Sequence, residues 1–369
     1  MSKKNLTKSA SERIEEAIDL IHNKQSNLYF FVIDTKGVPT GSLAYIYETG
    51  LYLSEQGYNV KFLHAEKDDF VGVREWLGDK YADLPHYDIE KDSPVIGPAD
   101  FLFIPEVYTN VMSATKGIQC RRIVILQNFR YMSELIPIGV SWDDLKMHDC
   151  ITTSDQLRNT VHEFFPNTSV KVVHPAIQDF FHDSSEPKKL IINVVSKNPT
   201  DIDAILKPFY WKYPNYSWVA FRNIANLPRE KFADALREGI ATVWCDTKTN
   251  FGYDALEAMA SGSIVIGKIP DEAPEWMGEN GSIRDNGLWF YDFRSACDII
   301  ASVVQSFIAD EIPQEIYDEM KNTVSDYSVE RQHREIDRAY GELFNETENA
   351  LKIILDKYKI EKHKKEDNG

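Results

Sequence analysis

Short, continuous apolar runs alternate with segments of helical periodicity along the first half of the chain. The first run, at 27–34, is followed by a loop containing Gly and Pro and by a segment at 42–57 whose apolar residues repeat at helical spacing. Apolar runs without strict alternation are typical of strands buried on both faces of a parallel sheet. The pattern therefore predicts one doubly wound α/β domain, with further strands at 59–64, 100–104, 122–127, 150–154 and 170–174.

The same pattern starts again after a polar stretch at 174–189 that contains two prolines. This restart predicts a second α/β domain, with the boundary near 175–187. Its strands are expected at 190–195, 216–221, 241–246, 263–267 and 287–292, and its helices at 201–212, 229–238, 253–261 and 294–308.

The chain from Pro313 onward reads as long, helical and charged, and we expect its segment 329–359 to lie back across the first domain. This organisation divides the chain into 1–178, 179–325 and a C-terminal helix with a basic tail at 326–369. The last residues, 357–369, hold five lysines against three acidic residues. They are interpreted as a frayed, solvated end or as a weak contact with an anionic membrane.

Charge and cysteine content exclude several classes of function. The formal net charge of −17 disfavours a general nucleic-acid binder, because such proteins need clustered Lys and Arg. The four cysteines show no zinc or CxxC spacing, and no metal-like histidine cluster is evident. The charged first residues do not read as a signal peptide, and apolar runs are too short to span a bilayer. We therefore expect a cytoplasmic protein, with the inner membrane face as a second location if the tail binds lipid.

Two doubly wound domains in tandem create a cleft between the carboxyl ends of their sheets, where ligands of such folds bind. The most informative loop there is 247–277. A predicted strand ends at Asp246, a polar loop with Gly252 follows, and an Ala-rich helix starts near Tyr253. The first amides of a helix have no internal partners, so this turn suits a diphosphate.

Glu257 lies about one turn into that predicted helix. A carboxylate at this place can accept two hydrogen bonds from a vicinal diol such as a ribose. The alternative interpretation is a surface carboxylate that interacts only with the helix dipole.

These residues resemble a known family. FGYDALEAMASGSIVIG at 251–267, PEW at 274–276 and NGLWFYD at 286–292 resemble the donor-binding half of the retaining GT-B glycosyltransferases of family 4. Further fragments agree with that family in order and spacing, and they are spread over most of the chain: 40–60, 151–181, 190–209, 226–246 and 327–344.

The resemblance implies a GT-B fold. Two Rossmann-like domains, an acceptor domain at 1–178 and a donor domain at 179–325, would face a central cleft, with the C-terminal helix crossing back to the first. It also implies retaining transfer of a sugar from a UDP- or GDP-linked donor to a glycan or lipid-linked acceptor, in bacterial surface polysaccharide biosynthesis. No metal or other cofactor is expected.

The family's E-x7-E motif is incomplete here, because Thr249 stands where its first Glu would be. The resemblance still supports ribose binding by Glu257, while the sugar contact falls to Thr249 or Asn250. The predicted donor-binding turn is completed by Phe251, Gly252 and Tyr253.

The family's Arg-x4-Lys pair is also missing, since Val195 and Thr200 occupy those places. Lys197 is the only cation in that loop and is the first candidate to stabilise the charge of the leaving diphosphate. Arg222, at the end of a predicted strand, is a second candidate. A solvated loop lysine is the alternative interpretation of Lys197.

In the first domain, Gly41 and Ser42 correspond to the family's Gly-rich loop, which approaches the donor phosphates, although plain turn chemistry also explains the glycine. Where many family members carry a His, the strand ends here offer Glu106 and Asn128. These two are predicted to line the acceptor pocket, with ordinary loop-capping as the alternative.

Two rival functions remain open from the sequence. The missing Glu, Arg and Lys fit a catalytically degenerate GT-B protein that binds nucleotide or glycan or supports a partner enzyme. A phosphorylase or a sugar-nucleotide epimerase on the same fold is the second rival, although neither a dense cationic phosphate site nor a lysine-bound cofactor is evident.

Overall fold

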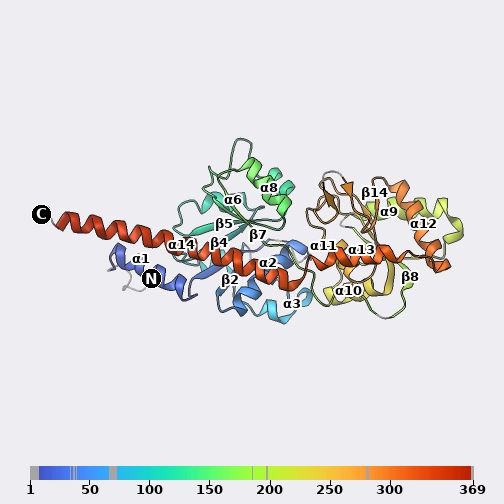
Figure 1. Cartoon of the computed structure of the whole chain (residues 1–369), viewed down its shortest axis with the longest axis horizontal. Coiled ribbons are helices and arrows are strands. Elements are labelled where there is room, and N and C mark those ends of the chain that lie inside the picture. The colour runs from blue at the N-terminus through green and yellow to red at the C-terminus, as the bar shows by residue number, and fades with distance from the viewer. Residues whose placement is uncertain are drawn as a thin grey trace.

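The computed structural model describes residues 8–33, 35, 38, 40–65, 73–184, 186–196, 198–279 and 282–366. Two α/β domains lie side by side along the long axis of the molecule, and helix α14 runs from the second domain along the first (Figure 1). The predicted α/β class with two doubly wound domains is confirmed.

The first domain is built on a seven-stranded sheet in the order β3-β2-β1-β4-β5-β6-β7. Every pair of neighbours in it is parallel. Its apolar runs are buried on both faces, as the lack of strict alternation predicts. The strands are β1 Asn27–Phe31, β2 Asn59–His64, β3 His86–Asp88, β4 Phe101–Pro105, β5 Arg121–Leu126, β6 Asp149–Thr152 and β7 Ser169–Val172.

The second domain is built on a five-stranded parallel sheet in the order β14-β11-β10-β8-β9. A short antiparallel hairpin, β12 with β13, lies outside it. The strands are β8 Lys189–Val195, β9 Ala220–Asn223, β10 Gly239–Trp244, β11 Ile264–Lys268, β12 Gly278–Glu279, β13 Ser282–Ile283 and β14 Leu288–Phe290.

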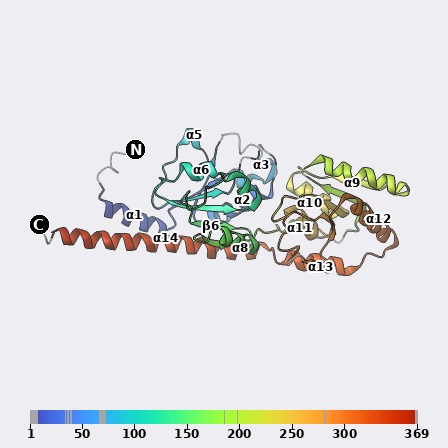
Figure 2. The ribbon, with the colours of Figure 1, turned by 90° about the horizontal axis from the view of Figure 1, so that it is seen from above.

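Helices cover both faces of the sheets and connect the strands (Figure 2). Those associated with the first sheet are α1 Ala10–His22, α2 Gly41–Glu55, α3 Val73–Trp76, α4 Asp79–Ala82, α5 Ile89–Asp92, α6 Thr109–Ala114, α7 Phe129–Leu135 and α8 Asp155–Phe164. The others are α9 Pro199–Lys212, the 3-10 turn η3 Pro214–Tyr216, α10 Arg229–Glu238, α11 Tyr253–Ala260, α12 Phe293–Ala309, α13 Gln314–Ser325 and α14 Val329–Glu366.

Helix α14 is part of the first domain's core, as the sequence predicts for the crossing helix. Tyr340 and Phe344 of this helix are buried, and their rings contact Phe103 and Phe101 of β4 respectively. Beyond this core, α14 continues past the sheet with α1 packed beside it, so that both elements project from the same end of the molecule (Figures 1 and 2).

Some local predictions differ from the structure. The strand expected at 216–221 is instead η3 followed by β9, because Pro214 opens a tight turn before the chain becomes extended. Helix α1, strand β3 and the β12–β13 hairpin are additional elements. Among the described residues, no helix combines the length and the apolar content that crossing a bilayer requires.

Candidate functional site

A cavity of about 340 Å³ lies between the two domains. Its walls come from the start of α2 in the first domain and from β8, α10 and α11 in the second. It is therefore placed at the carboxyl ends of the strands, where ligands of doubly wound sheets bind. The lining residues used below are Thr40, Gly41, Ser42, Arg229, Asp246, Thr249, Gly252, Tyr253, Asp254 and Glu257.

The amino end of α11 opens on this cavity. The residue before it, Gly252, has a φ of +77° and packs against Trp244 and Trp276, so that a side chain there would be both strained and crowded. No side chain caps the helix. The Thr249 hydroxyl instead accepts hydrogen bonds from the amides of Phe251 and Gly252, at 3.3 and 2.9 Å. The first turn of α11 is thus a site where an anion can be bound.

Glu257 is fully within the protein although it lines the cavity, with 6% of its surface exposed. Burial raises its pKa to about 8, against the opposing effect of Arg229. The Arg229 guanidinium donates to Glu257 Oε1 at 3.3 Å. The surface-carboxylate interpretation of Glu257 is therefore wrong, because the side chain faces the cavity from a buried position.

Arg229 also reaches the first domain. It donates to Glu48 Oε1 at 2.7 Å, and its guanidinium lies over the rings of Phe180 and Phe181. Burial raises the pKa of Glu48, and the two neighbouring carboxylates hold the pKa of Arg229 above its usual value despite burial. One guanidinium is shared by two buried carboxylates from different domains.

Arg229 is the residue that sequence reasoning missed. It is the only Lys or Arg among the described residues that line the cavity. In the sequence it is one of several charges at the start of an ordinary amphipathic helix, α10. Its pairing with Glu48 depends on how the domains meet, so no local pattern signals it.

Gly41 and Tyr253 bring the two domains into direct contact at the cavity. A Cβ atom built on Gly41 would lie 2.2 Å from Cδ2 of the Tyr253 ring. Thr40 caps α2 by accepting from the Leu43 amide, and Gly41 begins the helix. The glycine is therefore needed for the close approach of α2 to α11, in addition to its place in a turn.

The structure brings together about half of the residues predicted for the site. They come from α2 in one domain and from the loop and helix around α11 in the other. Those that line the cavity are Gly41, Ser42, Thr249, Gly252, Tyr253 and Glu257.

The other predicted donor-binding residues are engaged elsewhere. Asn250 accepts from the Phe129 amide of the first domain and donates to Glu272. Phe251 is buried, with its ring against Tyr253. Arg222 donates to Asn193, Glu238 and a backbone carbonyl, and none of these groups lies in the cavity lining.

The predicted catalytic residues also have other surroundings. Asn128 caps α7 and donates to the Lys248 carbonyl of the second domain at 2.7 Å. Glu106 is 2% exposed and does not line the cavity. Burial raises its pKa to about 8, opposed by hydrogen bonds from backbone amides. Lys197 lies outside the described residues.

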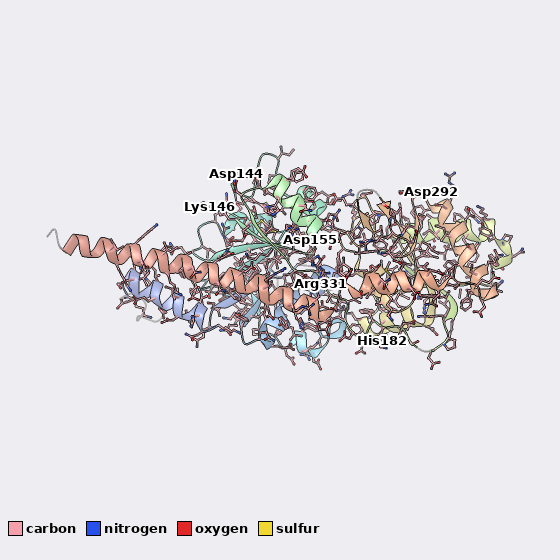
Figure 3. All side chains as sticks on the ribbon, viewed as in Figure 1. Asp144, Lys146, Asp155, His182, Asp292 and Arg331 are labelled. Atoms are coloured by element: carbon pink, nitrogen blue, oxygen red, sulfur yellow. The ribbon has the colours of Figure 1, made fainter. Side chains whose placement is uncertain are left out.

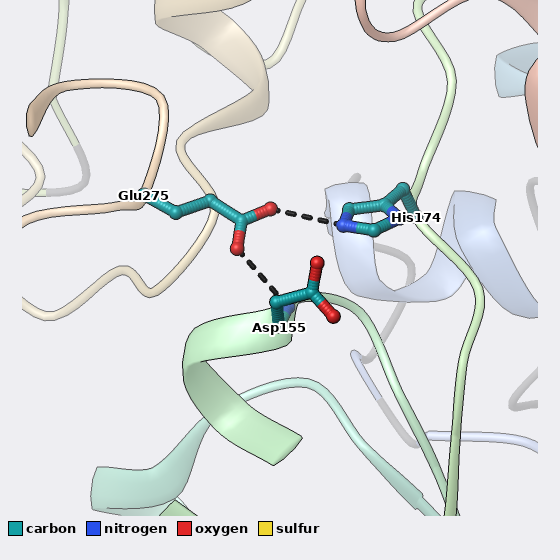
Figure 4. A group of neighbouring side chains, drawn as sticks. All are labelled: Asp155, His174 and Glu275. Carbon is teal, nitrogen blue, oxygen red and sulfur yellow. Dashed lines mark hydrogen bonds and ion pairs between the residues drawn. The ribbon is translucent and has the colours of Figure 1, made fainter. Parts of the chain in front are cut away.

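A second polar group joins the domains away from the cavity. Asp155, His174 and Glu275 each offer one ligand atom within 4.8 Å of the others, a spacing compatible with a metal ion (Figure 4). Both ring nitrogens of His174 are engaged, however, by Glu275 at 3.0 Å and by Glu335 at 3.0 Å. Burial lowers the pKa of His174, but the hydrogen bonds with these carboxylates outweigh it and raise that pKa to about 9. The negative charge of these carboxylates is thus already balanced by the positive charge of the His174 imidazolium.

Arg331 completes this group from the start of α14, near the junction of the domains (Figure 3). It donates to Glu335 at 3.0 Å and its guanidinium contacts the His174 ring. The amides of Asp155 and Gln156, at the start of α8, donate to Glu275.

Comparisons with known proteins show which proteins this chain resembles. No protein-family model matches the chain. The chain is 21% identical over 261 residues to an alpha-1,6-glucosyltransferase of Actinobacillus pleuropneumoniae serotype 7 (strain AP76), an alignment covering 67% of this chain and 76% of that protein.

Two solved structures extend the likeness over both domains. Alr3699/HepE of Anabaena, in complex with UDP-glucose, superposes with a TM-score of 0.59 at 12% identity, over 86% of this chain and 99% of that one. A glycosyltransferase of Rickettsia africae ESF-5 superposes with a TM-score of 0.58 at 12% identity, over 87% and 98%. By fold this chain is a GT-B protein, and its resemblance is to the retaining glycosyltransferases of family 4.

Proposed function

We propose that this protein is a retaining glycosyltransferase that moves a sugar from a UDP-sugar to a glycan or lipid-linked acceptor in bacterial surface polysaccharide biosynthesis. The observation that carries the proposal is the buried carboxylate of Glu257, one turn into a helix whose uncapped amino end lines the cavity between the domains. This arrangement offers a diol acceptor beside an anion site, which are the two features that a nucleoside diphosphate requires.

In this proposal the ribose hydroxyls donate to Glu257, and the diphosphate lies at the first turn of α11. Asp246 and Asp254 also line the cavity and would repel a diphosphate, so positive charge must come from the helix amides and from Arg229. Arg229 thus takes over part of the role that the family's missing Arg-x4-Lys pair plays. Lys197 remains a second candidate for that role.

The transfer itself needs no protein nucleophile. The bond between the sugar's anomeric carbon and the diphosphate oxygen breaks, and the acceptor oxygen bonds to the same carbon from the same face. The acceptor's proton passes to the departing phosphate oxygen. The chain supplies positioning, stabilisation of the leaving charge and exclusion of water by two domains. Thr249 is proposed to contact the donor sugar, and Ser42 the phosphates.

We propose glucose as the sugar and an α-1,6-linked glucan as the product. The support is that one relative is an alpha-1,6-glucosyltransferase and that one structural neighbour holds UDP-glucose. Both likenesses are distant in sequence, so the choice sets the first substrate to be tried.

The test measures UDP binding by calorimetry and glucose release from UDP-glucose by chromatography. The wild type is expected to bind UDP and to hydrolyse or transfer glucose slowly without added acceptor. Glu257→Gln is expected to weaken UDP binding about tenfold or more, since one strong diol interaction is lost. Glu315→Gln, at an exposed position on α13, is the matched control.

Two results would count against this function. Heat of binding with no turnover of UDP- or GDP-sugars in the presence of glycan acceptors would favour the degenerate GT-B protein. If neither UDP nor GDP gives a heat of binding, the proposed nucleotide site is wrong.

The basic tail leads to a proposal about location. Beyond the core, α14 carries the exposed residues Ile353, Ile354 and Ile360 together with Lys357 and Lys359. Apolar and cationic side chains on one projecting helix suit an anionic lipid surface, where lipid-linked acceptors would be found. Co-sedimentation with phosphatidylglycerol vesicles, compared with phosphatidylcholine vesicles, tests this contact.

A further inference from the structure

A second hollow, of about 390 Å³, lies on the second domain between the end of α9 and helix α12. Both views place α12 at the end of this domain that faces away from the first domain (Figures 1 and 2). None of the residues that line this second hollow also lines the donor cavity. The polar and aromatic residues that line it are Lys212, Tyr213, Asn215, Tyr216, Asp298, Ser302 and Gln305.

Aromatic rings form one side of the hollow. The rings of Tyr213 and Tyr216 have centroids 6.1 Å apart and are inclined by 29°. Trp218 is not itself a lining residue but contacts Tyr216 from beside the hollow, with ring centroids 6.5 Å apart and planes inclined by 82°, and it is 59% exposed. Its indole N–H donates to the Asn215 carbonyl at 2.9 Å, which fixes the ring. A large aromatic side chain held in place while most of its surface faces solvent is suited to contact with a ligand.

The other side of the hollow carries fixed polar groups. Lys212 and Asp298 form an ion pair at 2.5 Å, and the Tyr213 hydroxyl also donates to Asp298. Ser302 and Gln305 are exposed one and two turns further along α12. Because Lys212 and Asp298 neutralise each other, this side of the hollow offers hydrogen-bond donors and acceptors but no net charge.

We propose that this hollow binds a saccharide chain, at a site separate from the donor cavity. A pyranose has one apolar C–H face, which can stack on the exposed ring of Trp218, beside Tyr216. Its hydroxyls can both donate and accept, which suits a neutral mixture of amide, hydroxyl and ion-pair groups. A nucleotide phosphate would lack a free cation here, and a purely apolar partner would desolvate the Lys212–Asp298 pair at a cost.

Such a site would hold a growing glycan on the enzyme between transfers. A tethered acceptor end is present at an effective concentration well above that of free chains, so the second binding event becomes intramolecular. The choice of sugar rests on the proposed function: because the proposed donor is UDP-glucose, the probe is an α-1,6-linked glucan.

The experiment uses the full chain in native affinity gels polymerised with dextran, and saturation-transfer NMR with isomaltohexaose. Trp218→Ala is expected to lower the affinity for dextran at least fivefold, and Trp218→Phe to restore part of it. Gln305→Ala, at an exposed helix position, is expected to lower the affinity about twofold. Trp211→Ala is the control, since Trp211 is 77% exposed but belongs neither to the hollow nor to the row of rings that Trp218 forms with Tyr216.

Hydrolysis of UDP-glucose without acceptor should be the same in all four variants. This readout separates the two proposals, since loss of dextran binding with intact hydrolysis concerns only the hollow. The inference is overturned if the wild type binds neither glucan, or if Trp218→Ala binds both as well as Trp211→Ala does. It is equally overturned if Trp218→Ala changes only the oligomeric mass, which would identify a protein interface.

Discussion

At the scale of single residues, the site is governed by one guanidinium and two buried carboxylates. Glu48 and Glu257 both contact Arg229, and burial raises the pKa of each carboxyl group. Because a buried charge without a partner is expensive, the cluster is favoured when one carboxyl keeps its proton. Ionisation of Glu257 is therefore coupled to the arrival of a ligand that can hydrogen bond to it.

This coupling predicts a pH-dependent affinity. Because the pKa of Glu257 is raised to about 8, its carboxylate form increases as the pH rises from 7 to 9. Since the ionised form accepts two hydrogen bonds from a diol, the affinity for UDP should rise about five- to tenfold over that range. Calorimetry at pH 7, 8 and 9 measures it.

Glu257→Gln lacks this titration, so its affinity should change much less over the same range. Comparing variant with wild type removes the contribution from ionisation of UDP itself. An equal pH dependence in the two proteins would exclude Glu257 as the titrating group.

A second prediction at this scale concerns Gly41. Gly41→Ala places a methyl group against the partly buried ring of Tyr253, so α2 and α11 must separate. We expect UDP affinity to fall at least tenfold, while thermal stability of the separate domains changes little. The double variant Gly41→Ala with Tyr253→Ala should recover part of the loss, whereas pairing it with Tyr253→Phe should not, because the phenyl ring keeps the steric conflict.

At the scale of elements, the parallel strands and α11 could be predicted from local pattern. Strand β10 is buried along its whole length and β5 at all but its first residue, so continuous apolar sequence was a sufficient signal. Helix α11 follows a Gly whose positive φ sets its start. The predicted position of Glu257 depends only on that start and on helical geometry.

Other features depend on contacts between distant segments and had no local signal. Strand β3 is three residues long and forms only against β2. The Arg229–Glu48 pair joins residues 181 positions apart. Arg222 was predicted to bind the donor diphosphate because it ends a predicted strand, but its guanidinium binds Glu238 of α10, a contact that the strand pattern does not specify.

The group around His174 gives a prediction at the element scale, because it joins β7, α8, α14 and the second domain. The folded pKa of His174 is about 9 against 6.5 for a free histidine. Its stabilisation is thus fully present below pH 6.5 and is lost as the pH rises through 9. His174→Asn should cost about 2–3 kcal/mol at pH 6.5 and much less at pH 9.5.

Chemical denaturation at the two pH values measures this difference. His162→Asn, at an exposed position on α8, is the control, and it should leave the free energy of unfolding unchanged at both pH values. A cost for His174→Asn that does not change with pH would mean that packing, not the imidazolium charge, supports the junction.

At the scale of the whole molecule, several polar contacts join the two domains. Arg130 pairs with Asp271 at 2.5 Å, and the Asn128 amide reaches the Lys248 carbonyl. Interfaces of this kind favour relative motion of domains, and exposed ion pairs weaken in salt. The buried Arg229–Glu48 contact differs from such exposed pairs, because solvent screens it little.

We therefore expect domain closure to depend on Glu48 more than on the exposed pairs. In small-angle X-ray scattering, Glu48→Gln should increase the radius of gyration of the free protein. Arg130→Gln should have little effect, because solvent screens an exposed ion pair. UDP should reduce the radius in the wild type, since the proposed nucleotide site is lined by residues of both domains, and should do so less in Glu48→Gln. If neither variant nor nucleotide changes the radius, the domains do not move on binding, and water must be excluded from the cavity by local side-chain motion alone.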